Sequence, residues 1–141
     1  MHQSIVARGS RGWVVLADSI TTLGAAEAGA IVVTGSHGGR SAAEFALRVP
    51  LRLVVFNDAG VGKDGAGIAA LALMEQAGVP AATVRHDSAR IGDAQDAWAH
   101  GVLSHINAGA AALGLKPGAR LATALAALVG PANNRTAADA P

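Results

Sequence analysis

Four short apolar runs, separated by segments of helix-like pattern, most constrain what this chain can fold into. The runs are rich in valine and cover residues 12–17, 30–35, 51–56 and 81–85. Continuous rather than alternating hydrophobicity is typical of strands in a parallel sheet, because both faces of such a sheet are covered. We therefore expect four strands, each buried on both faces.

The segments between and after these runs have the pattern of helices. Pro50 and Pro80 stand just before the third and fourth runs, where proline helps to end a helix. The alternation of strand and helix predicts an α/β fold, with a three-layer, mostly parallel sheet of about four to five strands, flavodoxin- or Rossmann-like. The expected helices cover residues 19–29, 39–48, 65–78, about 94–113 and about 117–129, with Pro117 in the first turn of the last one.

The length of 141 residues is that of one domain. We expect residues 1–130 to form a single α/β domain and residues 131–141 to be a disordered C-terminal tail. A hydrophobic content of 51% indicates a chain that buries a core, but only 3% of the residues are aromatic. Because a core of small aliphatic side chains is modest, we expect a homo-oligomer or a subunit of a larger enzyme.

Charge and composition exclude several classes of partner. The net charge is +1 and no run of Lys or Arg occurs, so nucleic acid is not expected as a partner. The chain has no cysteine, which removes disulfides and thiolate nucleophiles and is compatible with a cytoplasmic location. The uncharged stretch 97–115 contains His100, Ser104, His105 and Asn107, which are costly in lipid. We therefore expect a soluble amphipathic helix there and no membrane partner.

Polar loops follow the predicted strands at one edge of the sheet. In open parallel sheets, ligands bind beyond the carboxyl ends of the strands. Asp18 and Ser19 follow the first strand, and three larger polar loops at 35–40, 57–65 and 86–90 follow the others. We therefore expect these loops to bind one small anionic molecule, with a carboxylate or phosphate group.

The loop GSHGGR at 35–40 is the first candidate site. Ser36, Gly38 and Gly39 would bind the anion through a hydroxyl and backbone amides, and Arg40 would clamp it. His37 would act as a general acid or base near neutral pH. The alternative is a flexible glycine-rich turn with a solvated histidine.

The loop NDAGVGKDG at 57–65 is the second candidate site. Asp58 and Lys63 are expected to be catalytic, and Asn57 and Asp64 to bind substrate. The alternative for Asp64 is a helix N-cap.

The same loop contains a literal GxGxxG at Gly60, Gly62 and Gly65, between a strand and a helix. This spacing makes NAD(P) an alternative ligand. Lys63 and Asp64 in the middle of the motif argue against it, because small apolar residues favour close packing of helix on sheet there.

The loop RHDSAR at 85–90 is the third candidate site. His86, Ser88 and Arg90 are expected to bind substrate, with Arg90 in a bidentate contact. Asp93 is expected to cap the next helix, and Arg90 to pair with it in the alternative reading. A divalent metal between His37, Asp58 and His86 is a weaker alternative, because no HxH or HExxH pairing supports it.

These residues together predict a small soluble metabolic enzyme that performs acid–base chemistry on a small anionic substrate. His37, Asp58 and Lys63 would carry the proton transfer, in a hydrolase, lyase or isomerase reaction. The alternative is a non-catalytic nucleotide- or metabolite-binding domain, or the small subunit of a larger enzyme.

Overall fold

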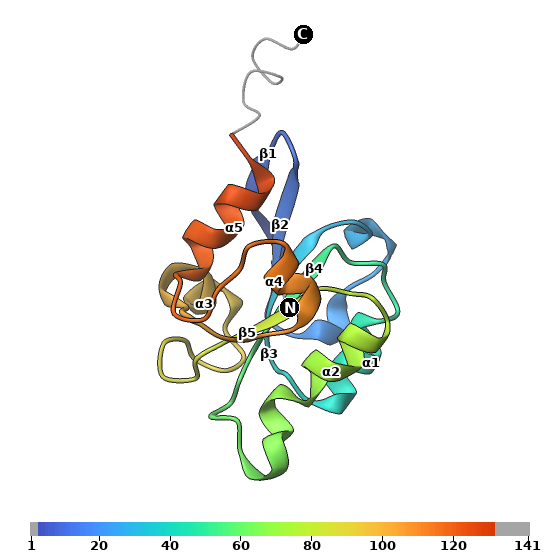
Figure 1. Cartoon of the computed structure of the whole chain (residues 1–141). Helices are drawn as coiled ribbons and strands as arrows, with labels where there is room; N and C mark the ends of the chain where they lie inside the picture. Colours follow the sequence, from blue (N-terminus) through green and yellow to red (C-terminus); the bar gives the residue numbers. More distant parts are fainter. Residues whose placement is uncertain (1–2, 132–141) are drawn as a thin grey trace, which may run out of the picture.

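The computed structural model describes residues 3–131, which contain one six-stranded sheet. The spatial order of the strands follows their order along the chain (Figure 1). Strands β2 to β5 pair in parallel, whereas β1 and β6 pair antiparallel at the two edges. The strands are β1 (Gln3–Gly9), β2 (Gly12–Ala17), β3 (Ile31–His37), β4 (Leu53–Asn57), β5 (Ala81–Val84) and β6 (Leu103–Ile106).

The four predicted strands correspond to β2, β3, β4 and β5, and the α/β class is confirmed. The mostly parallel, flavodoxin- or Rossmann-like arrangement is not confirmed, because the sheet is mixed. Strand β1 forms a hairpin with β2 and contains exposed residues such as Ser4 and Ile5, so its sequence lacks the continuous apolar run of a buried strand.

The helices lie on both faces of the sheet. Helices α1 and α2 pack on one face, and α3 and α5 pack on the other (Figure 1). The helices are α1 (Arg40–Ala46), α2 (Ala69–Gln76), α3 (Ala94–His100), α4 (Ala108–Ala112) and α5 (Leu121–Val129), and the 3₁₀ turns are η1 (Ile20–Thr22), η2 (Ala25–Glu27) and η3 (Lys63–Ile68).

The long helix predicted at about 94–113 is wrong. The chain forms α3, β6 and α4 there, because Gly101 ends α3 in an extended conformation. A Cβ atom on Gly101 would overlap the Ala97 carbonyl oxygen, so only glycine allows this close turn into β6. Asn107 then begins α4 by accepting a hydrogen bond from Ala110 N at 3.0 Å.

Two other predicted helices also need correction. Residues 19–29 form the two turns η1 and η2, because polar side chains bond to nearby backbone N–H groups in place of a helix. Ser19 Oγ accepts from Thr21 N, and Glu27 Oε1 accepts from Gly24 N at 2.7 Å. The last helix begins at Leu121, after Pro117, because the residues before it pair with the start of β6.

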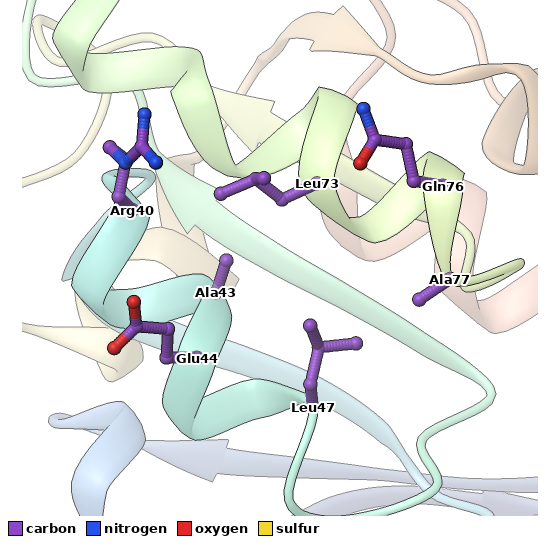
Figure 2. A pocket seen from close by; sticks show the side chains of 7 residues that line it. All are labelled: Arg40, Ala43, Glu44, Leu47, Leu73, Gln76 and Ala77. Atoms are coloured by element: carbon purple, nitrogen blue, oxygen red, sulfur yellow. The ribbon is translucent and has the colours of Figure 1, made fainter.

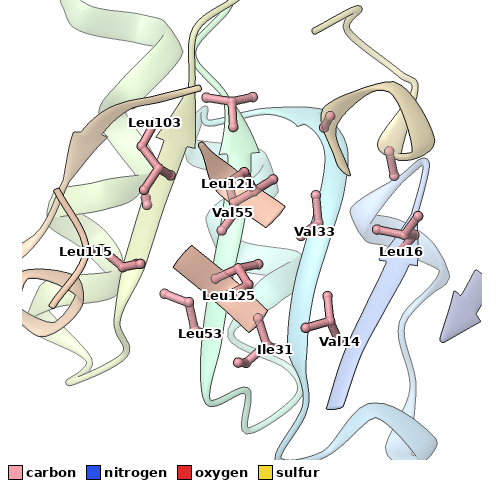
Figure 3. Close-up of a cluster of buried hydrophobic side chains, with 14 of the residues drawn as sticks. Val14, Leu16, Ile31, Val33, Leu53, Val55, Leu103, Leu115, Leu121 and Leu125 are labelled. Atoms are coloured by element: carbon pink, nitrogen blue, oxygen red, sulfur yellow. The ribbon is translucent and has the colours of Figure 1, made fainter. Parts of the chain in front are cut away.

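Two hydrophobic clusters lie on opposite faces of the sheet, because successive strand side chains point to opposite sides. Val14 and Val33 belong to the cluster under α3 and α5, whereas Val15 and Val32 belong to the cluster under α1 and α2. Figure 3 shows the first of these clusters, with residues of α5 beside those of the central strands. The buried strands β3 and β4 therefore have the continuous apolar sequences that predicted them.

Residues 85–93, called here the crossing segment, run across the carboxyl ends of β4 and β3 to reach α3. Asn57 Nδ2 donates to Ala89 O at 2.9 Å, and Gly92 N donates to Gly35 O at 2.7 Å. The loops after β3 and β4 lead to α1 and α2 on one face of the sheet, whereas the crossing segment after β5 leads to α3 on the other face. In open parallel sheets, ligands bind beyond the carboxyl ends of the strands, where this segment runs.

The tail predicted at 131–141 lies outside the described residues, except for Pro131. Between residues 3 and 131, none of the helices has the length and apolar character needed to cross a membrane.

Candidate functional site

His37 is the last residue of β3 and its side chain is exposed at the carboxyl edge of the sheet. The turn that follows is held from two sides: Gly38 N donates to Asn57 O at 2.9 Å, and Gly38 O accepts from Ala70 N at 2.8 Å. The histidine is therefore fixed between the end of β4 and the start of α2.

Gly39 provides the space that the His37 imidazole occupies. An ideal Cβ atom on Gly39 would lie 2.9 Å from His37 Nε2 and 3.0 Å from Cδ2. Gly39 N also donates to His37 O at 2.9 Å. The position of the imidazole thus depends on the absence of a side chain two residues later.

We expect Gly39→Ala to displace the His37 ring while lowering the free energy of unfolding by only about 1 kcal/mol. The clash is with the end of a rotatable side chain, so the ring moves and the backbone stays. The ¹H–¹³C signals of the His37 ring, assigned by their absence in His37→Gln, report the displacement. Unchanged ring signals would contradict this placement of the imidazole.

A cavity of about 480 Å³, called here the cationic cavity, opens on one side of His37. Arg40 comes from the start of α1, and Lys63 and Asp64 come from the loop after β4. Neither Arg40 nor Lys63 forms an ion pair with a residue between 3 and 131. Its lining residues are His37, Gly39, Arg40, Lys63, Asp64, Ala66 and Ala69.

A second cavity of about 340 Å³, called here the apolar cavity, also has His37 in its wall. Most of its exposed wall is apolar, although several residues carry hydroxyl groups. Its lining residues are Asp18, Ser19, Ile20, Thr21, Gly35, Ser36, His37, Ser41, Ala42, Phe45, Ile91 and Gly92.

Several polar side chains of the apolar cavity bond to the protein itself. Ser36 Oγ accepts from Ile20 N at 3.0 Å, and Asp18 Oδ1 accepts from Ala94 N at 2.9 Å. Ser19 Oγ and Thr21 Oγ1 lie 2.8 Å apart, within hydrogen-bonding distance. These contacts join β2, β3, η1 and α3 around the cavity.

The loop that carries Lys63 has a strained backbone. Ala59, Val61 and Asp64 have φ values of 52°, 69° and 58°, in the left-handed region that side chains disfavour. Val61 is the most unusual of these, because its side chain is β-branched. Such conformations cost about 1–3 kcal/mol each and cluster at functional sites.

Asp58 is buried and holds this loop to the crossing segment. Its Oδ1 atom accepts from Gly60 N at 2.8 Å and from His86 N at 3.0 Å, and lies 3.5 Å from His86 Nδ1. Asp58 lines neither the cationic nor the apolar cavity. The structure thus places His37 and Lys63 in the wall of the cationic cavity, whereas Asp58 lies outside that wall.

Asn57 has a similar position beside Asp58. Its Oδ1 atom accepts from Ala59 N at 2.8 Å, and its Nδ2 atom bonds to the crossing segment. Its side chain therefore lies against the protein backbone rather than in the two cavities around His37.

His86, Ser88 and Arg90 lie on the crossing segment and line neither cavity. Ser88 Oγ donates to Arg85 O at 2.8 Å and accepts from Val102 N at 3.0 Å. Arg90 Nη1 lies 3.9 Å from Asp93 Oδ2. Asp93 caps α3, as predicted, by accepting from Asp96 N at 2.9 Å.

Ionic contacts stabilise both ends of the crossing segment. Two hydrogen bonds from Arg85 lower the pKa of Asp87, and the same contact raises the pKa of Arg85. A hydrogen bond from Arg90 N, together with one involving His100, lowers the pKa of Asp96. These charges are exposed and hold the segment rather than line a cavity.

This geometry gives little support to a metal site or to NAD(P) binding. In the described part of the chain, no three His, Asp or Glu side chains are grouped to hold a metal ion. Gly60, Gly62 and Gly65 all have positive φ, but α2 begins only at Ala69, after η3. The dinucleotide fingerprint instead places its last glycine where helix packs on strand. NAD(P) binding therefore stays a prediction.

The alternative role of Asp64, as a helix N-cap, is wrong, because the N-cap of α2 is Ile68 and Asp64 lies inside η3. Sequence reasoning missed Ser41, Phe45 and Ile91 as lining residues. Ile91 and Phe45 carry no chemical signal, and only their positions on the segments that follow β5 and β3 could have indicated them.

A third hollow lies between α1 and α2, and Arg40 stands at one end of it (Figure 2). Its wall includes Ala43, Leu47 and Leu73, and Leu47 is 42% exposed. It contains no histidine, so the acid–base candidates lie around His37.

No family model matches this chain, and no curated protein or solved structure matches it. The case for a function therefore rests on the chemistry of the residues around His37.

Proposed function

We propose that this protein is a small metabolic enzyme that binds a carboxylate- or phosphate-bearing substrate in the cationic cavity and uses His37 for proton transfer. The observation that supports this most is the grouping of His37, Arg40 and Lys63, from the loops that follow β3 and β4, around one cavity. Both cations lack an ion-pair partner among residues 3–131, so they are available to an anion.

The two cations have different roles in binding. The planar guanidinium of Arg40 suits a bidentate contact with a carboxylate or phosphate, and the Lys63 ammonium adds a compact charge. A substrate anion held there lies next to the His37 imidazole, since the same cavity wall includes all three side chains.

His37 is the proposed acid–base group. An imidazole both accepts and donates protons near neutral pH, and such catalysis contributes about 10²–10⁴-fold to a rate. Lys63 would stabilise negative charge that develops beside the bound anion. Hydrolysis, elimination and isomerisation all use this combination.

Asp58 has a different role in this proposal from the catalytic one expected from sequence. Its carboxylate accepts two backbone hydrogen bonds and is buried away from the cationic cavity. It is therefore a positioning residue for the loop that carries Lys63.

The binding part of the proposal is tested by titrating ¹³C-histidine-labelled protein with sodium acetate and inorganic phosphate at constant ionic strength. We expect saturable shifts of the His37 signals, and at least tenfold weaker binding in Arg40→Ala and Lys63→Ala. Arg8→Ala and Lys116→Ala remove the same charges from exposed positions outside the cavity and should bind normally. Equal weakening in all four variants would mean a general charge effect and would contradict the site.

The catalytic part is tested with a panel of small carboxylic acids and phosphate esters. Turnover by the wild type should fall by about 10²-fold or more in His37→Ala, while anion binding, measured for this variant by isothermal titration calorimetry, persists. Saturable anion binding with no turnover of any panel member would favour the alternative, a non-catalytic metabolite-binding domain.

A further inference from the structure

The apolar cavity shares His37 with the cationic cavity but is lined by neither of the two cations, and the proposed proton transfer leaves it unused. His37 lines both cavities, so a molecule that reacts at the imidazole is in reach of both. What the apolar cavity can bind follows from the groups on its wall.

The polar groups of this wall are largely engaged by the protein. Ser36 Oγ accepts from Ile20 N, Asp18 Oδ1 accepts from Ala94 N, and the hydroxyls of Ser19 and Thr21 lie within hydrogen-bonding distance of each other. A ligand that offered many hydroxyl or amide groups would have to compete with these contacts.

The remaining wall is apolar and partly open to solvent. Ile20 and Ala42 are buried beneath it, and Phe45 is half-buried. Ile91 is 52% exposed and contributes its apolar side chain to the same wall. Ile91 belongs to the crossing segment and shares the cavity wall with Ser36 and His37.

We infer that the apolar cavity binds the uncharged aliphatic chain of the substrate whose anionic group lies in the cationic cavity. This inference rests on the proposed function and narrows its substrate class to acids or phosphates with a short alkyl chain. The anion lies against Arg40 and Lys63, the chain lies between Phe45 and Ile91, and His37 faces the carbon atoms between them. Ligand sites commonly combine such an apolar wall with a few polar groups that fix orientation.

The test compares the dissociation constants of acetate, butanoate and hexanoate, measured from the His37 signals at constant ionic strength. Burial of each added methylene should tighten binding by about two- to fourfold. Ile91→Ala should weaken hexanoate by about fivefold and leave acetate unchanged. Ser41→Phe, which fills the cavity from an exposed position, should remove the dependence on chain length.

Ile5→Ala is the matched control, because Ile5 is 48% exposed on β1 and does not line the cavity. Normal acetate binding with no gain in affinity from acetate to hexanoate would overturn this inference and leave the proposed function standing. If affinity rises along the series but neither Ile91→Ala nor Ser41→Phe alters that rise, the alkyl chain binds elsewhere. That result would also overturn this inference. Failure of acetate and phosphate to bind at all would overturn both.

Discussion

Replacing Asn107 with alanine is expected to lower the free energy of unfolding by about 3–5 kcal/mol. The Asn107 side chain connects α4, α2 and the stretch 79–81 at the start of β5: its Oδ1 atom accepts from Ala81 N at 2.9 Å and Ala110 N at 3.0 Å. Its Nδ2 atom lies 3.0 Å from Val79 O and 3.3 Å from Leu71 O, donating to both. Asn107 is only 6% exposed, so water cannot readily replace these bonds.

Chemical denaturation followed by circular dichroism measures this loss. Asn107→Asp should also destabilise, because it keeps the acceptor oxygen but places a carboxylate against two carbonyl groups. Gln95→Ala removes an exposed amide from α3 and should change stability by less than about 0.5 kcal/mol. A loss below about 1 kcal/mol in Asn107→Ala would show that this residue does not connect the three segments.

The second large effect is expected for Gly67→Ala, which should lower the free energy of unfolding by about 3 kcal/mol and weaken anion binding. A Cβ atom on Gly67 would overlap the Asp58 carbonyl oxygen and lie 3.0 Å from Val61 O. Both neighbours are backbone atoms, and Gly67 N donates to Val61 O at 2.7 Å. The loop must therefore open, and Lys63 moves with it.

The same denaturation and phosphate titration measure the two losses. Gly24→Ala is a suitable control, because nothing lies within 4 Å of its Cβ position and its φ is −146°. It should leave both quantities unchanged. Wild-type stability in Gly67→Ala would contradict the close approach of the two loop ends.

The parallel strands could be predicted because burial on both faces leaves a continuous apolar run, as at Val32 and Val33. The end of α3 could not, because Trp98, Val102 and Ile106 recur at helical spacing across it. What ends the helix is a close approach at Gly101, which depends on the Ala97 carbonyl and not on local sequence pattern. Propensity and periodicity carry no information about such a contact.

The candidate site, like the fold, could be predicted from the sequence only in part. The topology of α/β folds predicts which residues reach the carboxyl edge, and His37 and Lys63 were found in this way. The topology does not predict which side chains at this edge bond to backbone groups. Asp58 and Lys63 lie in the same loop, but the Asp58 side chain is buried. The crossing segment makes the difference, because its His86 N donates a hydrogen bond to Asp58 and leaves Lys63 in the cavity wall.

The sequential order of the strands has a consequence for synthesis on the ribosome. Each strand from β2 to β6 emerges when its neighbour in the sheet is already present, so the sheet can grow in the direction of translation. Helix α5 emerges last among the described elements, yet it packs on β1 and β2. Until Leu121, Leu125 and Val129 are made, the part of one apolar face that α3 does not cover stays open in the nascent sheet, which exposes it to aggregation.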